Sequence, residues 1–242
     1  MISIIAPMKN EAENVEALVR EISETCAVLA PFEVILIDDG SDDGTGKVIA
    51  TLQQEFPWLR QLRHPQSAGQ SAAVHSGVRA AQGDIICTLD GDGQNPPGEI
   101  PNLAAPLLDA NAPTDLGLVA GQRVDRDDTW SRRAASTLAN GLRSWLLNDG
   151  TRDTGCGLKA FRRDAFVDLP YFDHMHRYLP ALFVRHGWRV AHVDVSHRAR
   201  EAGRSKYSNI GRALVGLYDL IGVAWLIKRR KRANPTEIPP RD

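Results

Sequence analysis

Short apolar runs that alternate with helical patterns are the feature that most limits the fold of this chain. Ile2–Ala6, Glu33–Ile37 and Ile85–Leu89 are rich in isoleucine and valine and predict strands buried on both faces. The segments between them carry apolar residues at helical spacing, which predicts helices over Glu13–Leu29, Thr45–Phe56 and Gln70–Ala81. This order of strands and helices predicts an α/β fold with a doubly wound, mostly parallel sheet flanked by helices.

Polar clusters follow three of these predicted strands. Pro7-Met8-Lys9-Asn10-Glu11 comes after the first strand, Asp38-Asp39-Gly40-Ser41 after the second, and Asp90-Gly91-Asp92-Gly93-Gln94 after the third. Ligands bind to open α/β sheets at the carboxyl ends of the strands, where the strand order reverses. We therefore expect the three clusters to meet in one cleft.

The second half of the chain has a less regular pattern. Leu116–Ala120 and Arg189–Val195 predict two further strands, and Thr129–Leu147 predicts a helix with two arginines near its start. Ser208–Arg232 predicts an apolar-rich helix that ends in a run of basic residues. The last ten residues contain three prolines and predict a frayed tail. The chain has no internal repeat or linker, so we expect one domain with a C-terminal appendage.

The charges are unevenly distributed along the chain, although the formal net charge is only -1. Residues 1–120 contain 17 acidic and 6 basic residues, whereas residues 121–242 contain 13 acidic and 23 basic residues. Such an asymmetry indicates an anionic partner, which can be nucleic acid, phosphate or membrane. The alternative is that two halves of one fold differ in charge without a common partner. A hydrophobic content of 43% excludes a mainly disordered chain.

The three cysteines, Cys26, Cys87 and Cys156, are far apart and form no CxxC pair. This spacing argues against a disulfide framework or a zinc site and fits a reducing, cytoplasmic compartment. The N-terminus lacks the basic start and long apolar run of a signal peptide. No run of 18 apolar residues occurs, so we expect no transmembrane helix.

Asp90, Asp92 and Gln94 form the most specific local motif. Alternate residues of an extended segment point the same way, so the three side chains can face one cation. Their oxygen atoms suit Mg²⁺ or Mn²⁺, which commonly also bind substrate phosphates. The alternative is an acidic turn that caps a helix starting at Pro96-Pro97.

Two better-known motifs are excluded by their spacing. A calcium-binding loop that starts at Asp90 needs glycine at its sixth position and glutamate at its twelfth, where this chain has Asn95 and Pro101. A phosphate-binding loop around Gly46-Lys47 needs a hydroxyl residue where this chain has Val48. No GxGxxG follows the first strand. P-loop and dinucleotide enzymes are therefore disfavoured.

Two further signals concern nucleotide and phosphate groups. A carboxylate at Asp38 or Asp39 can accept hydrogen bonds from a base or a ribose, although turn chemistry explains the same residues. Arg200, Ser205 and Lys206 can bind phosphate oxygens through charge-assisted hydrogen bonds, although charged runs are commonly solvated loops. An earlier basic set consists of Arg123, Arg132 and Arg133.

Taken in order, these motifs resemble the family 2 glycosyltransferases, which have the Rossmann-like GT-A fold. Within that family the chain looks most like the branch of dolichol-phosphate mannosyltransferases and polyprenyl-phosphate glycosyltransferases. The resemblance covers residues 2–212. The matching segments are Ile4-Ile5-Ala6-Pro7, Asn10-Glu11, Asp38 to Thr45, Ala68-Gly69, Gly77, Gly83-Asp84, Asp90 to Pro97, Gly121-Gln122-Arg123, Asp153 to Gly157, Lys159-Ala160-Phe161 and Arg200 to Lys206.

The resemblance implies a role for each candidate residue. The nucleotide pocket would be lined by Pro7, Asn10, Glu11, Asp38, Asp39, Gly69, Asp90 and Gly91. Mg²⁺ or Mn²⁺ would be held by Asp90, Asp92 and Gln94. Arg200, Ser205 and Lys206 would bind phosphates, and Arg123 with Arg132 or Arg133 would receive the acceptor phosphate. Asp153 would line the sugar or acceptor side. The catalytic group would then consist of Asp92, Arg123, Arg132, Arg133, Asp153, Arg200 and Lys206.

The implied reaction is inverting transfer of a sugar from a nucleotide diphosphate to a polyprenyl phosphate (dolichyl or undecaprenyl) at the cytoplasmic membrane face. A phosphate acceptor is already anionic and needs no base, whereas a hydroxyl acceptor on a glycan or lipid would need one, for which Asp153 is the candidate. A nucleotidyltransferase and an inactive membrane-docking module fit these motifs less well. The sequence predicts neither the sugar, the nucleotide base nor the oligomeric state.

The expected domains are a catalytic domain over residues 1–206, a helix over 207–232 and a disordered tail over 233–242. Within the helix, Leu214–Ile227 is shorter than the ~20 residues that a membrane span needs. We expect an amphipathic helix that lies in the membrane interface, with Trp225 at its boundary, or docks on a membrane-embedded partner subunit.

Overall fold

The computed structural model describes residues 1–124, 146–147, 150–151, 153–198, 209–231 and 236. Most of the predicted helix Thr129–Leu147 lies outside these residues, as does most of the expected C-terminal tail. Five of the candidate site residues also lie outside them: Arg132, Arg133, Arg200, Ser205 and Lys206.

A seven-stranded sheet forms the centre of the described part, with the strand order β3-β2-β1-β4-β6-β5-β7. The strands are β1 (Ile2–Met8), β2 (Phe32–Asp39), β3 (Leu59–His64), β4 (Ile85–Thr88), β5 (Leu116–Arg123), β6 (Lys159–Arg162) and β7 (Arg189–Val195). All neighbouring strands are parallel except β6, which runs antiparallel to both β4 and β5. The predicted α/β fold with a doubly wound, mostly parallel sheet is confirmed.

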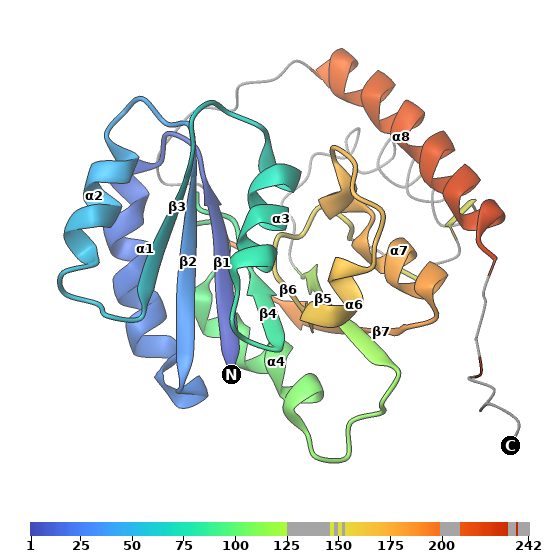
Figure 1. The fold of residues 1–242 in the computed structure, drawn as a ribbon, viewed down its shortest axis with the longest axis horizontal. Coiled ribbons are helices and arrows are strands. Elements are labelled where there is room, and N and C mark those ends of the chain that lie inside the picture. The colour runs from blue at the N-terminus through green and yellow to red at the C-terminus, as the bar shows by residue number, and fades with distance from the viewer. Residues whose placement is uncertain (125–145, 148–149, 152, 199–208, 232–235, 237–242) are drawn as a thin grey trace, which may run out of the picture.

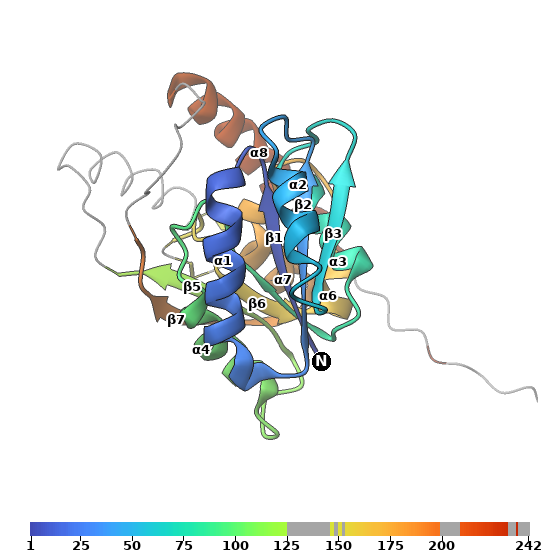
Figure 2. The same cartoon turned by 90° about the vertical axis from the view of Figure 1, so that its left-hand side faces the viewer.

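Helices cover both faces of the sheet (Figures 1 and 2). One face carries α1 (Ala12–Thr25), α2 (Thr45–Leu52) and α4 (Ile100–Leu108). The opposite face carries α3 (Gln70–Ala80), α6 (Arg163–Val167), α7 (Leu179–His186) and α8 (Asn209–Arg229). Short 3₁₀ turns occur at Ala27–Leu29, Pro97–Glu99 and Met175–Arg177, labelled η1, η2 and η3.

Alternating side chains of the central strands supply two separate cores. Ile4 and Leu36 pack with the helices of one face, whereas Ile5 and Ile35 pack with the helices of the other. All four side chains are fully buried, and burial of each contributes about 1.5–3 kcal/mol. This burial on both faces explains why these strands appear in the sequence as continuous apolar runs.

Three elements of the fold are not predicted by the apolar pattern of the sequence. β3 has the sequence LRQLRH and lies at one end of the sheet, so it needs little apolar character. β6 is only four residues long. α4 contains Pro101 and Pro106, which obscure its helical pattern. The predicted helix Glu13–Leu29 also ends earlier, because α1 stops at Thr25 and a 3₁₀ turn follows.

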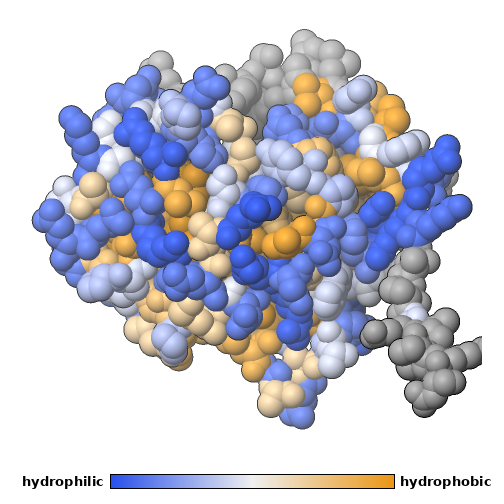
Figure 3. Space-filling model, viewed as in Figure 1, coloured by the Kyte–Doolittle hydropathy of each residue, from blue (hydrophilic) through white to orange (hydrophobic). Residues whose placement is uncertain are grey.

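The helix α8 is present where the sequence predicts it, but it carries apolar residues on more than one face. Leu220 and Val223 pack into the core, while Tyr218, Ile221 and Trp225 are exposed. Figure 3 shows apolar side chains at the surface over α8. A simple amphipathic pattern is therefore not confirmed. Among the helices of the described residues, none combines the length and the hydropathy needed to cross a membrane.

Candidate active site

Two adjoining pockets lie beyond the carboxyl ends of β1 and β4, and both are lined by Pro7, Gln70 and Asp90. The first, called here the Lys159 pocket, has a volume of ≈390 Å³. Its other lining residues are Val74, Thr88, Leu89, Thr154, Gly155, Cys156, Gly157, Lys159, His176, Arg177 and Leu179. The second, called the Asp92 pocket, has a volume of ≈260 Å³. It is completed by Met8, Lys9, Glu11, Asp39, Gly91 and Asp92.

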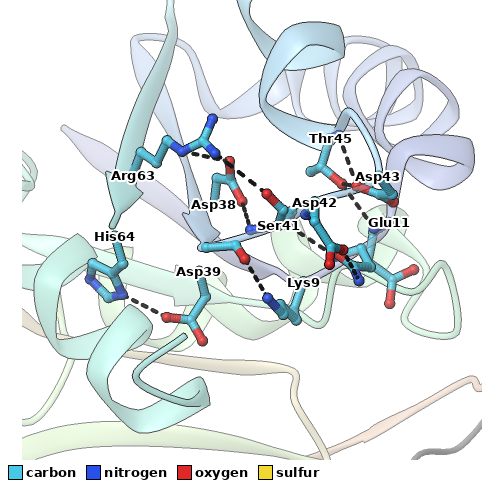
Figure 4. Close-up of polar contacts among 12 residues, drawn as sticks. Lys9, Glu11, Asp38, Asp39, Ser41, Asp42, Asp43, Thr45, Arg63 and His64 are labelled. Carbon is cyan, nitrogen blue, oxygen red and sulfur yellow. Dashed lines mark hydrogen bonds and ion pairs between the residues drawn. The ribbon is translucent and has the colours of Figure 1, made fainter. Parts of the chain in front are cut away.

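The end of β2 places Asp39 at the Asp92 pocket and Asp38 behind it. Asp38 is fully buried and accepts a hydrogen bond from the Ser41 N–H at 2.8 Å. The Arg63 guanidinium Nε lies 3.6 Å from its other oxygen (Figure 4). Asp38 Oδ1 thus supports the turn after β2, whereas the buried Oδ2 has no hydrogen-bond partner among the described residues. Asp38 is not among the residues that line the Asp92 pocket.

Asp39 holds together the loop that precedes α3. Its carboxylate accepts hydrogen bonds from the N–H groups of Ala68 at 2.8 Å and Gly69 at 2.9 Å. The Ser67 hydroxyl donates to it at 2.7 Å, and His64 Nδ1 lies 2.7 Å away. Burial alone would raise the pKa of Asp39, but these hydrogen bonds, beginning with that of Ala68, hold it below the usual range. Gly69 has a φ of +91° that suits glycine at this position.

The segment after β1 is tied to the segment after β2. The Asn10 N–H donates to the Ser41 hydroxyl at 3.0 Å, and the Asn10 side-chain amide donates to Asp42 at 2.7 Å. The Glu11 N–H donates to the Thr45 hydroxyl at 3.0 Å (Figure 4). Lys9 donates to the Gly40 carbonyl. Pro7 and Glu11 line the pockets, whereas Asn10 braces the loop behind them.

Asp90 and Asp92 follow β4 and face the Asp92 pocket. The amides of Gln70 and Asn95 each donate to a different oxygen of Asp90, at 2.7 and 2.9 Å, and so fix its orientation. Burial, and then the negative charge of Asp92, raise the pKa of Asp90 above its usual value. The charges of Lys159 and Arg123 act in the opposite direction and offset part of this effect. A bound cation would further reduce the repulsion between the two carboxylates.

This donor set fits a divalent cation bound together with substrate. Mg²⁺ is commonly held by one or two carboxylates, waters and substrate phosphates rather than by a complete protein cage. Within the residues that the structure describes, no group of three His, Cys, Asp or Glu side chains is placed to hold a metal. The space around Asp90 is also closely bounded, because a Cβ on Gly157 would collide with its carboxylate.

Gln94 connects the aspartate loop to the chain that follows β7. The Gln94 carbonyl accepts a hydrogen bond from the Arg198 N–H at 3.0 Å, and the Gln94 amide donates to the Arg198 carbonyl at 3.5 Å. Arg198 is itself held by Glu21 at 2.8 Å. The last described residues before the Arg200–Lys206 segment thus lie beside the metal-binding candidate.

Arg123 and Asp153, two of the predicted catalytic residues, form a bidentate ion pair. Arg123 Nε lies 2.6 Å from one Asp153 oxygen and Nη2 lies 2.9 Å from the other. Both side chains are at most 15% exposed. The hydrogen bond to Asp153 raises the pKa of Arg123. Each charge of this pair is compensated by the other.

The structure also brings two residues to the site that the sequence assigned no role. Lys159 in β6 is 4% exposed and donates to the Cys156 carbonyl. His176 lies 2.7 Å from the Ser71 hydroxyl, and burial, with the positive charges of Lys159 and Arg177, lowers its pKa to about 3. A lysine inside the apolar run from Leu158 to Phe161 is the signal that could have singled out Lys159, because lysine is rarely buried unless its charge is paired.

Solved structures show the same fold at low sequence identity. Glucosyl-3-phosphoglycerate synthase from Mycobacterium tuberculosis, in complex with Mn²⁺, UDP and glucosyl-3-phosphoglycerate, has a TM-score of 0.70 and 20% identity over 94% of this chain and 79% of its own. The same synthase also has a complex with Mg²⁺ and UDP.

Two other structures are similar to the same extent. A mannosyltransferase from Pyrobaculum calidifontis, in complex with GDP-Man and Mn²⁺, has a TM-score of 0.68 and 20% identity, and the match covers 97% of this chain but only 65% of that one. Mannosyl-3-phosphoglycerate synthase from Rubrobacter xylanophilus has a TM-score of 0.70 and 17% identity over 95% of this chain and 74% of its own.

A family assignment comes from the sequence itself. The sequence model of the family described as "Glycosyl transferase family 2" matches residues 3–169, which is more than half of the chain and spans β1 to α6. The matched region contains the Asp38-Asp39, Asp90-x-Asp92 and Arg123–Asp153 groups. The chain belongs to glycosyl transferase family 2.

Proposed function

We propose that the protein is an inverting glycosyltransferase that moves a sugar from a nucleotide diphosphate to a polyprenyl phosphate. Membership of family 2 supports the reaction class. Residues 1–206 would form the catalytic domain. Pro7, Glu11 and Asp39 would line the nucleotide pocket, with Asp38, Asn10 and Gly69 supporting its loops.

Asp90 and Asp92, with Gln94 beside them, would hold Mg²⁺ or Mn²⁺ against the donor diphosphate. The ion would supply electrostatic stabilisation for the negative charge that develops on the diphosphate leaving group. Gln70 and Asn95 keep Asp90 in a fixed orientation, which avoids reorganisation during the reaction. Arg200, Ser205 and Lys206, outside the described residues, would add phosphate contacts.

The ion pair between Arg123 and Asp153 is the observation that carries the choice of acceptor. An acceptor hydroxyl would need a base, and Asp153 is the candidate for that role. Its two oxygens instead face the Arg123 guanidinium at 2.6 and 2.9 Å, and such a pair makes a carboxylate a poor proton acceptor. A phosphate monoester is already anionic and requires no base, so this geometry favours it.

The surface of α8 supports an acceptor that resides in a membrane. Tyr218, Ile221 and Trp225 are 80%, 61% and 58% exposed on this helix. The helix ends at Arg229 in a run of basic residues, which would be attracted to anionic lipids. We propose peripheral binding at the cytoplasmic membrane face, either to lipid or to a membrane-embedded partner subunit.

The test is transfer of radiolabelled sugar from a panel of nucleotide sugars, with Mn²⁺ or Mg²⁺, to undecaprenyl or dolichyl phosphate. The expected product is a labelled lipid that is cleaved by mild acid. The free polyprenols and 3-phosphoglycerate serve as comparison acceptors, since each would accept the sugar on a hydroxyl group. Transfer to a hydroxyl acceptor, and none to polyprenyl phosphate, would contradict the proposal.

A further inference from the structure

The Lys159 pocket contains more basic than acidic side chains, and one of them has no hydrogen bond or ion pair with the described residues. Its formally charged lining residues are Asp90, Lys159 and Arg177. The Arg177 side chain makes no hydrogen bond or ion pair with the part of the chain that the structure describes. An uncompensated guanidinium at the wall of a pocket of ≈390 Å³ indicates an anionic ligand.

Lys159 and Arg177 line the same pocket from two different elements. Lys159 comes from β6 and Arg177 from the 3₁₀ turn Met175–Arg177. Both charges act on His176, whose pKa of about 3 keeps it neutral. Burial also lowers the pKa of Lys159, although the charges of Asp90 and Asp153 act in the opposite direction. An anion bound beside Lys159 would likewise favour its ammonium form.

The pocket lies next to the expected reaction centre and next to α8. It shares Asp90 with the Asp92 pocket, so a group bound in it adjoins the donor diphosphate. The turn that carries Arg177 is fixed to α8 by two contacts: His174 Nδ1 lies 2.9 Å from Asp219, and the Tyr178 hydroxyl donates to the Gly216 carbonyl at 3.1 Å. A ligand that reaches the reaction centre along α8 would meet Arg177.

We propose that the Lys159 pocket binds the phosphate monoester of the acceptor through Arg177 and Lys159. This inference rests on the proposed function and deepens it by naming the residues that bind the acceptor phosphate. Arg123 is the other candidate for that role, but its guanidinium is already paired with Asp153. Arg177 supplies charge-assisted hydrogen bonds, and Lys159 is a second, buried cationic group that the bound phosphate would hold in its ammonium form. The phosphate oxygen that attacks the sugar is thereby held beside the donor.

The test compares Arg177→Gln and Arg177→Lys with the wild type and with Arg79→Gln. Arg79 is an exposed arginine of α3 that lines neither pocket, so it controls for loss of surface charge. For Arg177→Gln we expect the KM for polyprenyl phosphate to rise at least tenfold, while the KM for the nucleotide sugar stays within twofold. Arg177→Lys is expected to recover part of this loss. An unchanged acceptor KM, or a rise confined to the donor KM, overturns the inference.

A binding measurement separates this inference from the proposed function. Calorimetric titrations with farnesyl phosphate and with 3-phosphoglycerate, in the presence of Mn²⁺ and nucleoside diphosphate, need no turnover. Affinity for either phosphate that falls at least tenfold in Arg177→Gln supports the pocket, and the stronger ligand identifies a lipid or a small-molecule source. Affinities for both phosphates that do not depend on Arg177 overturn it. Transfer to polyprenyl phosphate by the wild type tests the proposed function separately.

Discussion

Two pairs of aspartates stand at strand ends in this protein, and the structure places them in different surroundings. Asp38 and Asp39 follow β2 and accept hydrogen bonds from their own surroundings, including three backbone N–H groups. Asp90 and Asp92 follow β4 and repel each other beside a pocket. The fold holds the first pair by hydrogen bonds, except that the buried Asp38 Oδ2 has no hydrogen-bond partner among the described residues. The second pair lies at the pocket where we propose that a cation binds.

The difference lies in the donors that surround each pair. Hydrogen bonds from Ala68, Gly69 and Ser67 lower the pKa of Asp39 despite burial. Burial and the charge of Asp92 raise the pKa of Asp90, although two amides hold its oxygens. Aspartates that follow two strands of one sheet therefore differ in the direction of their pKa shift. The balance of donors and charges distinguishes a structural carboxylate from one available to a cation.

The largest effect is expected from Asp92→Asn, which removes one charge of the second pair. We expect kcat/KM to fall roughly 10²–10³-fold, because stabilisation of the leaving diphosphate is lost. The thermal midpoint of the metal-free protein should not fall, since repulsion with Asp90 is relieved. Steady-state kinetics and thermal melting measure both. Asp84→Asn, at an exposed aspartate, is the control, and equal activity of the two variants would refute the distinction between the pairs.

The second-largest effect is expected on stability, from Asp39→Ala. This substitution removes the carboxylate that accepts hydrogen bonds from the loop before α3. Two backbone N–H groups and the Ser67 hydroxyl lose their partner, so we expect a loss of about 2–4 kcal/mol in the free energy of unfolding. Urea denaturation measures this loss. Asp42→Ala, whose side chain is exposed, should cost less than about 1 kcal/mol. A similar small cost for Asp39→Ala would show that the first pair is not structural.

Gly157→Ala tests the space around the second pair without changing a charge. The added Cβ would collide with the Asp90 carboxylate, so we expect Asp90 to turn away from the cation position. The predicted result is a roughly tenfold weaker affinity for Mn²⁺, or about 1.4 kcal/mol. Gly98→Ala is the matched control, because its Cβ would meet only ordinary contacts at 3.8 Å or more. Titration of Mn²⁺ in the presence of nucleotide measures both; equal affinities would contradict the geometry.

The smallest expected effect is a pH dependence of the stability that Asp39, a member of the first pair, contributes. A carboxyl with a lower pKa in the folded than in the unfolded protein contributes stability above its unfolded pKa and loses it as the pH falls through its folded pKa. The reference pKa of Asp39 is 3.8, and its folded pKa is lower. The difference in unfolding free energy between wild type and Asp39→Asn should therefore be constant above about pH 5 and shrink below 3.8. Urea denaturation at several pH values measures it, and a difference that grows on acidification would contradict the hydrogen-bonded state of Asp39.

The sheet could be predicted where strands are buried on both faces. β1, β2 and β4 appear as apolar runs, and their order along the chain predicts a parallel sheet with polar clusters at one edge. β3 and β6 could not be predicted in this way, because one is a polar end strand and the other has four residues. The antiparallel insertion of β6 depends on long-range pairing with β4 and β5 that no local pattern encodes.

The candidate site was predictable in its location but not in its internal pairing. The sequence placed Pro7, Asp39, Asp90 and Asp92 at one cleft, and the structure brings all four to adjoining pockets. The ion pair of Arg123 with Asp153 joins residues 30 positions apart and had no sequence signal. Arg177 had no sequence signal for a similar reason, since only the fold shows that it lines the same pocket as Asp90.

The central claim is that Asp90 and Asp92 hold a divalent cation on a nucleotide diphosphate, and a linked binding experiment tests it most directly. Calorimetric titration of UDP and of GDP into the wild-type protein, with and without Mn²⁺, measures the coupling between metal and nucleotide. The account predicts that Mn²⁺ strengthens binding of one nucleotide at least tenfold and that Asp92→Asn abolishes this gain. Nucleotide affinities that are the same with and without Mn²⁺ in the wild type would contradict it.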